Sequence, residues 1–249
     1  MLDKTYYTLT VAGLDPCGGA GILADIKTME AHGLIGMSVC SAITYQNDIA
    51  FKKVDWIPVE NIIAQIDVLL ERFQFTAVKI GLIENYEVLI KVLSYLRSKI
   101  SDTCFILWDP ILKASAGFNF HTNPSTDTLN QIAAHVNLIT PNQDEIKILL
   151  PATTQSSIHA LSEQCAILLK GGHLTTSHSN DVLIQNKSET TFTAARLNAE
   201  KRGTGCVLSS AIVSNIALGL SLEASITKAK QYVEKYLVSS TNRLGFHYA

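Results

Sequence analysis

The sequence predicts an α/β fold in which helices cover both faces of a mostly parallel sheet. Short apolar, β-branched runs alternate with longer segments of helical periodicity, and this alternation is typical of parallel sheets. Glycines and functional polar residues follow most of the predicted strands directly, at the edge where such sheets bind ligands. The chain has no internal repeat and no long Pro/Gly/Ser linker, so its 249 residues are expected to form one domain, 1–249.

The first half of the chain alternates regularly between the two kinds of segment. A β-branched run at 8–12 predicts the first strand, and the apolar residues Ile62, Ile66, Leu69 and Phe73 recur at the spacing of a helix. On the same grounds we expect further strands at 39–45, 77–80 and 104–108, and helices at 22–32, 60–73, 87–98 and 126–134.

The second half adds a hairpin to this alternation. Two short runs, 181–185 and 190–196, are separated by the turn residues Asn186-Lys187-Ser188. Elsewhere in this half we expect strands at 136–139 and 166–169, and helices at 142–150, 157–164, 205–218 and 222–239. The order of the strands in the sheet does not follow from these patterns.

Composition excludes several classes of protein. Hydrophobic residues make up 47% of the chain and charged residues 17%, which is too apolar for a disordered protein. With 20 basic and 22 acidic side chains and no Lys/Arg run, the chain lacks the charge pattern of a nucleic-acid binder. No apolar stretch reaches the roughly 18 residues of a membrane span, and the amino terminus has no signal pattern. We therefore expect a cytoplasmic protein that binds neither nucleic acid nor membrane.

The cysteines point to one position of interest. None of the five forms a C-x-x-C pair, which argues against zinc or redox chemistry. Four are interpreted as buried thiols that behave as small hydrophobic residues. Cys206 differs because it follows two glycines at the start of a predicted helix.

Six predicted strands lead into loops with functional residues. Taken alone, each has a structural interpretation: Asp109 can begin a turn, Asn142 can cap a helix with Glu145 as its partner, and Lys170 can extend from an apolar strand to solvent. Their joint occurrence at one edge of a sheet favours a ligand site. The loops are 13–21, Gln46-Asn47-Asp48, Gly81, Asp109-Pro110, Thr140-Pro141-Asn142 with Glu145, and Lys170-Gly171-Gly172-His173.

Two standard nucleotide motifs do not account for these loops. Residues 19–24 match the G-x-G-x-x-A dinucleotide fingerprint, but no Asp or Glu ends the second strand, where a ribose hydroxyl would need one. NAD binding is therefore disfavoured. The Walker pattern G-x-x-x-x-G-K-[ST] is absent, so phosphate binding would have to use another turn.

The segment Gly203-Thr204-Gly205-Cys206 is the best candidate for that turn. Glycines at a helix start leave several main-chain N–H groups free to bind an anion, and the helix dipole adds positive potential. The same field is expected to lower the pKa of the Cys206 thiol, which would then accept a proton from an attacking hydroxyl or orient it. On this motif alone, an ordinary helix-entry turn with Cys206 facing the core remains the alternative.

Taken together, these segments resemble the hydroxymethylpyrimidine/phosphomethylpyrimidine kinases of thiamin biosynthesis, members of the ribokinase-like superfamily. The resemblance covers nearly the whole chain and implies a three-layer ribokinase-like fold. Its most specific parts are the opening segment and the Gly-Thr-Gly-Cys signature. The matching segments, in family order, are 11–28, Gln46-Asn47, 78–81, Asp109-Pro110, Thr140-Pro141-Asn142 with Glu145, 169–173 and 203–206.

The resemblance implies transfer of phosphate from ATP, with Mg, to the hydroxymethylpyrimidine alcohol and then to its monophosphate. Carried over by position, Gly13, Asp25 and Gln46 would hold the pyrimidine, and Leu82 would lie against the ring. Gln46 would read the amino and ring-nitrogen edge, because an amide donates and accepts at once. The resemblance also implies a homodimer.

The same resemblance assigns residues to the phosphates. Gly203, Thr204 and Gly205 would form an anion hole, with Cys206 where the sugar kinases of the superfamily carry an aspartate base. Lys170 would neutralise the charge of the transferring phosphate. The remaining assignments concern ATP and its metal: Asn142 with Glu145 would organise Mg and the phosphates, Asp109 would border the nucleotide, and Gly172 would contact it.

The chain departs from the family pattern at several positions. Leu14, Leu82 and Arg202 stand where the family usually has Ser, Met and His, and the tail 243–249 replaces a glycine- and histidine-rich one. Ser115 occupies the position of a family Lys, with Lys113 two residues earlier. Arg202 either supplies an additional cation for phosphate or is a solvated surface residue.

Two other functions stay open on the sequence. A pyridoxal or pyridoxine kinase would share the fold and the cysteine signature, and Gln46 does not exclude a pyridine ring. A non-catalytic ligand-binding module derived from such a kinase would be expected to lose the phosphate-binding residues, yet Lys170, Glu145, Gly203 and Gly205 are all present.

Overall fold

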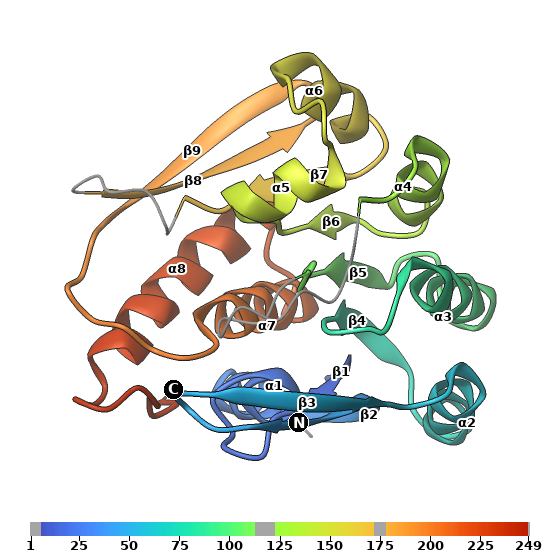
Figure 1. Cartoon of the computed structure of the whole chain (residues 1–249), viewed down its shortest axis with the longest axis horizontal. Helices are drawn as coiled ribbons and strands as arrows, with labels where there is room; N and C mark the ends of the chain where they lie inside the picture. Colours follow the sequence, from blue (N-terminus) through green and yellow to red (C-terminus); the bar gives the residue numbers. More distant parts are fainter. Residues whose placement is uncertain (1–5, 113–122, 172–177, 249) are drawn as a thin grey trace.

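The computed structural model describes residues 6–112, 123–171 and 178–248. These residues contain one nine-stranded sheet with the order β3-β2-β1-β4-β5-β6-β7-β8-β9 (Figure 1). Neighbouring strands from β2 to β7 run parallel, and antiparallel pairs flank them at both edges. The strands are β1 (Tyr7–Leu14), β2 (Ile35–Gln46), β3 (Phe51–Trp56), β4 (Phe75–Ile80), β5 (Phe105–Trp108), β6 (Leu138–Ile139), β7 (Ala166–Leu169), β8 (His178–Gln185) and β9 (Ser188–Ala195).

Helices pack on both faces of the sheet, as the alternation predicts. Figure 1 shows α2, α3 and α4 gathered on one side of the molecule, and α7 and α8 on the other. The helices are α1 (Gly21–Ala31), α2 (Val59–Leu70), α3 (Tyr86–Lys99), α4 (Thr126–Ala133), α5 (Gln143–Leu149), α6 (Gln155–Ser162), α7 (Thr204–Ala217) and α8 (Leu222–Val238).

The two faces bury separate hydrophobic cores. Successive side chains of a strand point to opposite faces, and on β5 the fully buried Ile106 and Leu107 accordingly belong to different clusters. Ile106 packs with residues of α2, α3 and α4, whereas Leu107 packs with residues of α1, α7 and α8. The sheet is thereby fixed between two helical layers.

Helix α7 is the most deeply embedded of these helices and positions the site. Eleven of its 14 residues are buried, and a helix that is buried nearly all round belongs to the interior of a fold. It contacts α1 and α8 on its sides and β1, β4 and β5 beneath it. Its first turn therefore has a fixed place relative to the carboxyl ends of these strands.

The edge strand β3 is absent from the sequence-based expectation. It pairs antiparallel with β2, with Tyr45 opposite Lys53 and Ile43 opposite Asp55. The charged side chains Lys52, Lys53 and Asp55 are exposed and obscure the strand pattern of Phe51–Trp56. Charged residues are common on edge strands because they discourage pairing with other chains.

The β8–β9 hairpin forms with a shorter turn than predicted. Gln185 pairs with Ser188, so Ser188 begins β9 and the turn contains only Asn186 and Lys187. Both turn residues have positive φ, 49° and 65°. Two consecutive residues with positive φ define the type I′ turn, which matches the twist of a two-residue hairpin.

No helix in the described ranges is both long and apolar enough to cross a membrane.

Candidate active site

Asp109, Lys170 and Ser209 meet at the carboxyl edge of the sheet. Asp109 follows β5 and Lys170 follows β7, and Lys170 Nζ lies 2.9 Å from Asp109 Oδ1. Thr140 Oγ1 donates to the same oxygen at 3.0 Å, and Ser209 Oγ on α7 donates to Asp109 Oδ2 at 3.2 Å. Burial opposes ionisation of Asp109, but the charges of Lys170 and Lys79 keep the pKa of its carboxyl below the ordinary value. Asp109 is thus a buried anion next to a cation that is partly exposed.

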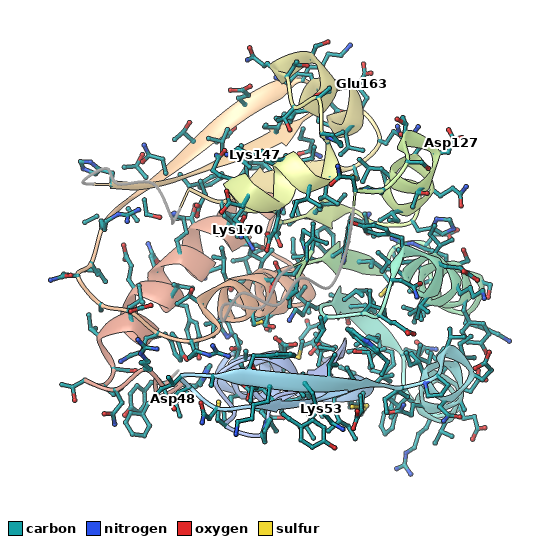
Figure 2. The ribbon with its side chains drawn as sticks, in the orientation of Figure 1. Asp48, Lys53, Asp127, Lys147, Glu163 and Lys170 are labelled. Carbon is teal, nitrogen blue, oxygen red and sulfur yellow. The ribbon has the colours of Figure 1, made fainter. Side chains whose placement is uncertain are left out.

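Lys170 also connects this anion to α5. Its main-chain N–H donates to Pro141 O at 2.8 Å, and its Nζ lies 3.9 Å from Glu145 Oε2. Figure 2 shows the Lys170 label between the ribbons of α5 and α7. The Lys170 ammonium, which follows β7, therefore lies between Asp109 at the end of β5 and Glu145 in the first turn of α5.

Asn142 and Glu145 form the predicted capping box. The Asn142 side chain accepts from the main-chain N–H of Glu145 at 2.9 Å, and Glu145 Oε2 accepts from the main-chain N–H of Asn142 at 2.7 Å. The structural interpretation of this pair is therefore confirmed. It is compatible with a role at the site, since the capping carboxylate is also the one that faces Lys170.

A second buried ion pair supports the loop that carries Lys170. The main-chain N–H of Gly171 donates to Asp181 Oδ1 at 2.9 Å, and Asp181 Oδ2 lies 2.5 Å from Lys230 Nζ on α8. A Cβ on Gly171 would meet the main-chain oxygen of Asn180 at 2.0 Å. The exit from β7 is thus fixed by β8 and α8 together.

The start of α7 has the features expected of an anion hole, formed by the main-chain N–H groups of Gly203, Thr204 and Gly205. Gly203 is the N-cap and has φ of 69°, and a Cβ there would lie 1.9 Å from Gly19 O. Among the described residues no side chain caps this helix. By contrast Asn85, which caps α3, accepts a hydrogen bond from the first turn of its helix. The first N–H groups of α7 therefore have no capping side chain in the described part of the chain.

Gly205 brings this anion hole against the charged groups. A Cβ on Gly205 would lie 3.5 Å from Lys170 Nζ and 4.0 Å from Asp109 Oδ2. Glycine therefore keeps a space open that a side chain would occupy. Helix dipole, ammonium and carboxylate all border this space, as the handling of a phosphoryl group requires.

Cys206 lies beside the anion hole, but its predicted low pKa is wrong. The thiol is buried in the first turn of α7 and receives a hydrogen bond from the main chain of Gly21. Burial raises its pKa to about 11, although the charge of Lys79 acts in the opposite direction. Loss of hydration outweighs the charge of Lys79. Cys206 is therefore a neutral thiol at pH 7.

Asp25, which is predicted to hold the pyrimidine, is bound by several side chains inside the fold. Its side chain is fully buried, and both carboxylate oxygens lie within 2.7 Å of Lys79 Nζ. Thr10 and Ser210 also donate to it, each at 2.7 Å. Asp25 is on α1, and its three partners are on β1, β4 and α7, so these hydrogen bonds connect four elements. The contact of Asp25 with the pyrimidine stays a prediction, and in this structure its carboxylate is bound by Lys79, Thr10 and Ser210.

The other residues predicted for the ring lie together at the ends of β1, β2 and β4. A Cβ on Gly13 would meet Leu82 Cδ2 at 3.0 Å, so these two residues are direct neighbours. Gln46 ends β2, and its Nε2 donates to Thr44 Oγ1 at 3.0 Å. Its Oε1 accepts from Arg202 Nη2 at 2.7 Å. Arg202 is therefore engaged with a site residue and is not a free surface side chain.

Several groups at the site could not be assigned from the sequence. Ser209 and Thr140 carry ordinary residue types, and only the fold shows that they bind Asp109. Lys79 does leave a signal, because a lysine inside an apolar strand needs a buried partner. The predicted nucleotide residue Gly172, like Lys113 and Ser115, lies outside the described residues.

The described residues contain no group of three or more His, Cys, Asp or Glu side chains that could hold a metal ion. Mg²⁺ is commonly bound by one or two carboxylates together with substrate oxygens. Asp109 and Glu145, which flank Lys170, are the carboxylates available.

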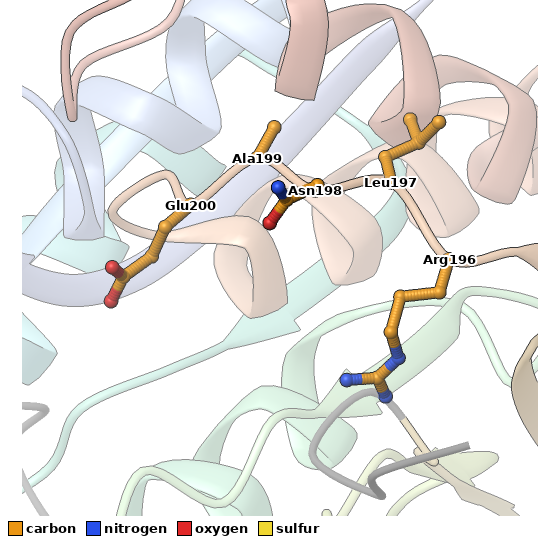
Figure 3. Close-up of a pocket in the computed structure, with 5 residues that line it drawn as sticks. All are labelled: Arg196, Leu197, Asn198, Ala199 and Glu200. Atoms are coloured by element: carbon orange, nitrogen blue, oxygen red, sulfur yellow. The ribbon is translucent and has the colours of Figure 1, made fainter. Parts of the chain in front are cut away.

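A separate surface concavity of about 620 Å³ lies along the segment between β9 and α7. Figure 3 shows the five consecutive residues that line it, Arg196 to Glu200. None of the predicted site residues borders it, so it does not define the active site.

The environment of Glu145 predicts an unusual pH dependence of stability. Burial raises its pKa to about 7, and the nearby charge of Asp109 adds to the effect, while Lys170 opposes it. The folded chain therefore binds the proton more tightly than the unfolded chain, and the associated stability is lost as pH rises through about 7. Relative to Glu145→Gln, we expect the free energy of unfolding of the unmodified protein to fall by roughly 2–3 kcal/mol between pH 4 and pH 8.

Urea unfolding of both proteins over this pH range measures the difference. The same change at the exposed Glu163 controls for the loss of a surface charge. Parallel pH profiles for the unmodified protein and Glu145→Gln would contradict the prediction.

An open parallel sheet whose carboxyl edge carries an uncapped helix start, a lysine and two carboxylates defines an α/β phosphotransferase. The comparison with known families is more specific. The chain belongs to the phosphomethylpyrimidine kinase family, whose model matches residues 15–248.

Individual relatives agree with this family. The chain is 33% identical to the hydroxymethylpyrimidine/phosphomethylpyrimidine kinase of Aquifex aeolicus, over 96% of this chain and 97% of that protein. The structure of phosphomethylpyrimidine kinase from Clostridium difficile superposes with a TM-score of 0.77 at 28% identity, over 93% of this chain and 99% of that one. Pyridoxal kinase from Staphylococcus aureus in complex with ADP gives a TM-score of 0.84 at 20% identity, over 99% and 93%. The predicted ribokinase-like fold is confirmed.

Proposed function

We propose that the protein transfers the γ-phosphoryl group of ATP to the hydroxymethyl oxygen of 4-amino-5-hydroxymethyl-2-methylpyrimidine and then to its monophosphate, as a step of thiamin biosynthesis. Family membership supports the reaction and the substrate class. The observation that carries the proposal is the open space in front of Gly205, bordered by Lys170 Nζ and Asp109 Oδ2. Anion hole, cation and carboxylate converge there.

The chain's own residues act mainly by positioning and by charge stabilisation. The transition state of phosphoryl transfer is loose, with negative charge on the three equatorial oxygens. The N–H groups of Gly203, Thr204 and Gly205 and the ammonium of Lys170 would stabilise this charge. Little charge develops on the attacking oxygen in such a transition state, so a strong base is not required. A neutral Cys206 thiol can orient the hydroxyl and accept its hydrogen bond.

The residues present also suit magnesium and the nucleotide. Asp109 and Glu145 would bind the metal together with phosphate oxygens, and Asn142 would keep Glu145 in place through the capping box. When bound, Mg²⁺ neutralises the phosphate charge. The carboxyl of Glu145 can be protonated near pH 7 in the free protein, so metal binding there would release a proton.

The experiment that tests the proposal compares substrates under steady-state conditions with ATP and Mg²⁺. The aminopyrimidine alcohol and its monophosphate are expected to be phosphorylated with a much higher kcat/KM than pyridoxal. The structural similarity to pyridoxal kinase concerns the fold alone, at 20% identity. A higher kcat/KM for pyridoxal would replace the proposed substrate by the alternative one. Binding of a ring without any ATP turnover would favour the non-catalytic module.

Cys206 provides a direct test of the catalytic part. We expect Cys206→Ala to lower kcat by about 100-fold, because the attacking hydroxyl loses its orientation, and to change the pyrimidine KM by about threefold at most, as for a group that acts in the transition state. Cys165→Ala makes the same change at a buried thiol in the opposite core and serves as control. An unchanged kcat in Cys206→Ala would reduce this cysteine to a packing residue.

We also propose that the protein is a homodimer, on the basis of its family resemblance. Light scattering coupled to size-exclusion chromatography would measure the mass. A mass near the 27.1 kDa of one chain would reject the dimer.

A further inference from the structure

Arg202 connects the anion hole to the predicted ring site. It immediately precedes Gly203, the N-cap of α7, and its Nη2 donates to Gln46 Oε1 at 2.7 Å. Its main chain is held at both ends: the N–H donates to Arg243 O at 2.8 Å, and the carbonyl accepts from Tyr236 Oη at 3.0 Å. The side chain therefore leaves from a fixed point beside the phosphate-binding turn and ends at the amide of Gln46.

Stability alone does not explain this placement. Arg202 Nε is buried and has no hydrogen-bond partner in the described part of the chain. A buried donor without a partner is costly to the folded state. The guanidinium is nevertheless directed to Gln46, which indicates that this contact serves the site.

The hydrogen bonds around Gln46 fix the direction of its amide. A guanidinium only donates, so the group facing Arg202 must be the amide oxygen. On the other side, Thr44 Oγ1 gives its proton to Leu14 O at 2.8 Å and is left to accept from Gln46 Nε2 at 3.0 Å. The hydrogen bonds to Arg202 and to Thr44 therefore require the same orientation of the Gln46 amide. One lone pair of Gln46 Oε1 and one hydrogen of Nε2 are not used by these two hydrogen bonds, and the positions of the acceptor and the donor are fixed.

We propose that Arg202 determines ring specificity as a positioning residue that acts through Gln46. The inference rests on the proposed function. An aminopyrimidine edge offers a donor-only amino group beside an acceptor-only ring nitrogen, and it matches the locked amide in one orientation alone. A ring hydroxyl both donates and accepts, so a pyridine alcohol such as pyridoxal adapts to either orientation. Locking the amide therefore favours the aminopyrimidine.

The test is the ratio of kcat/KM for the aminopyrimidine alcohol to that for pyridoxal. In Arg202→Met we expect this ratio to fall about tenfold or more, through loss on the pyrimidine, because the released glutamine side chain must be ordered again on binding. Arg202→Lys keeps one donor and loses the planar fork, so its ratio should lie between those of Arg202→Met and the unmodified enzyme. Thermal unfolding of each variant checks that it is folded.

A double-mutant cycle separates action through Gln46 from a general effect of charge. In a Gln46→Ala background, Arg202→Met should change the pyrimidine kcat/KM by about twofold at most, since the group on which Arg202 acts is missing. An equal loss in both backgrounds would overturn the proposal. Arg243→Met removes a nearby arginine whose Nη1 donates to Asp48 O at 3.5 Å, and should leave the ratio unchanged.

Failure of this inference is distinguishable from failure of the proposed function. If Arg202→Met phosphorylates the pyrimidine and keeps the preference of the unmodified enzyme, only the role of Arg202 is overturned. If the unmodified enzyme phosphorylates neither ring, the proposed function fails and the inference fails with it.

Discussion

Replacing Lys170 by methionine is expected to lower kcat by about 100- to 1,000-fold. Lys170 Nζ would lie 3.5 Å from a Cβ added to Gly205. No other described cation lies within 4 Å of that position. Methionine has a similar length and keeps most of the packing while removing the charge. Steady-state kinetics at saturating ATP and pyrimidine would measure the loss. A kcat within about threefold of the unmodified enzyme would contradict the assigned role.

Loss of Lys170 also leaves buried carboxylates without their cation, so stability must be measured separately. Breaking one partner of a buried pair costs about 3–5 kcal/mol. The double variant Asp109→Asn/Lys170→Met removes the unpaired charge and should recover part of the stability without recovering activity. Lys147→Met is the matched control, because Lys147 is an exposed lysine on α5 that pairs with the exposed Asp144, at 3.8 Å.

The two glycines at the start of α7 are expected to fail in different ways when each is replaced by alanine. Gly203 has φ of 69°, and an added Cβ would lie 1.9 Å from the main-chain oxygen of Gly19. The main chain must move, so we expect Gly203→Ala to lose several kcal/mol of stability, at least roughly 2 kcal/mol, together with activity. Gly205 has no such clash: the nearest atom to its added Cβ, Lys170 Nζ, would be 3.5 Å away.

Gly205→Ala should therefore fold normally and still lose activity, by about 100-fold, because its methyl group occupies the space meant for the phosphoryl oxygens. Thermal unfolding and kcat, measured on both variants, test the contrast. Similar unfolding temperatures for the two variants would contradict the predicted clash at Gly203, and an active Gly205→Ala would show that the space in front of Gly205 is not the transfer site.

Local sequence patterns predicted the helices and strands well where hydrophobic burial or turn residues determine the pattern. Apolar periodicity and turn residues identified the eight helices and eight of the nine strands in the described part of the chain. The missing strand, β3, lies at the edge and has exposed Lys52, Lys53 and Asp55, so burial leaves little pattern there. The position of the functional loops also followed from the sequence, because the carboxyl ends of parallel strands must share one edge.

The site was less predictable where long-range contacts decide the chemistry. Asp25 stands on a helix beside a conspicuous glycine-rich loop, but its partner Lys79 is 54 positions away and takes up its carboxylate. For Cys206, the helix start is visible in the sequence, whereas the burial that raises its pKa to about 11 is a property of the whole fold. Arg202 and Gln46 are 156 positions apart, and no local pattern links them.

The nearly complete enclosure of α7 ties phosphate recognition to the integrity of the whole molecule. Helix α7 contacts α1, α8 and the central strands β1, β4 and β5. Movement of its first turn would therefore disturb the packing of the helix against the middle of the sheet. Local fluctuations are smallest in such central elements. The proposed phosphate-binding turn therefore begins a helix that is buried nearly all round.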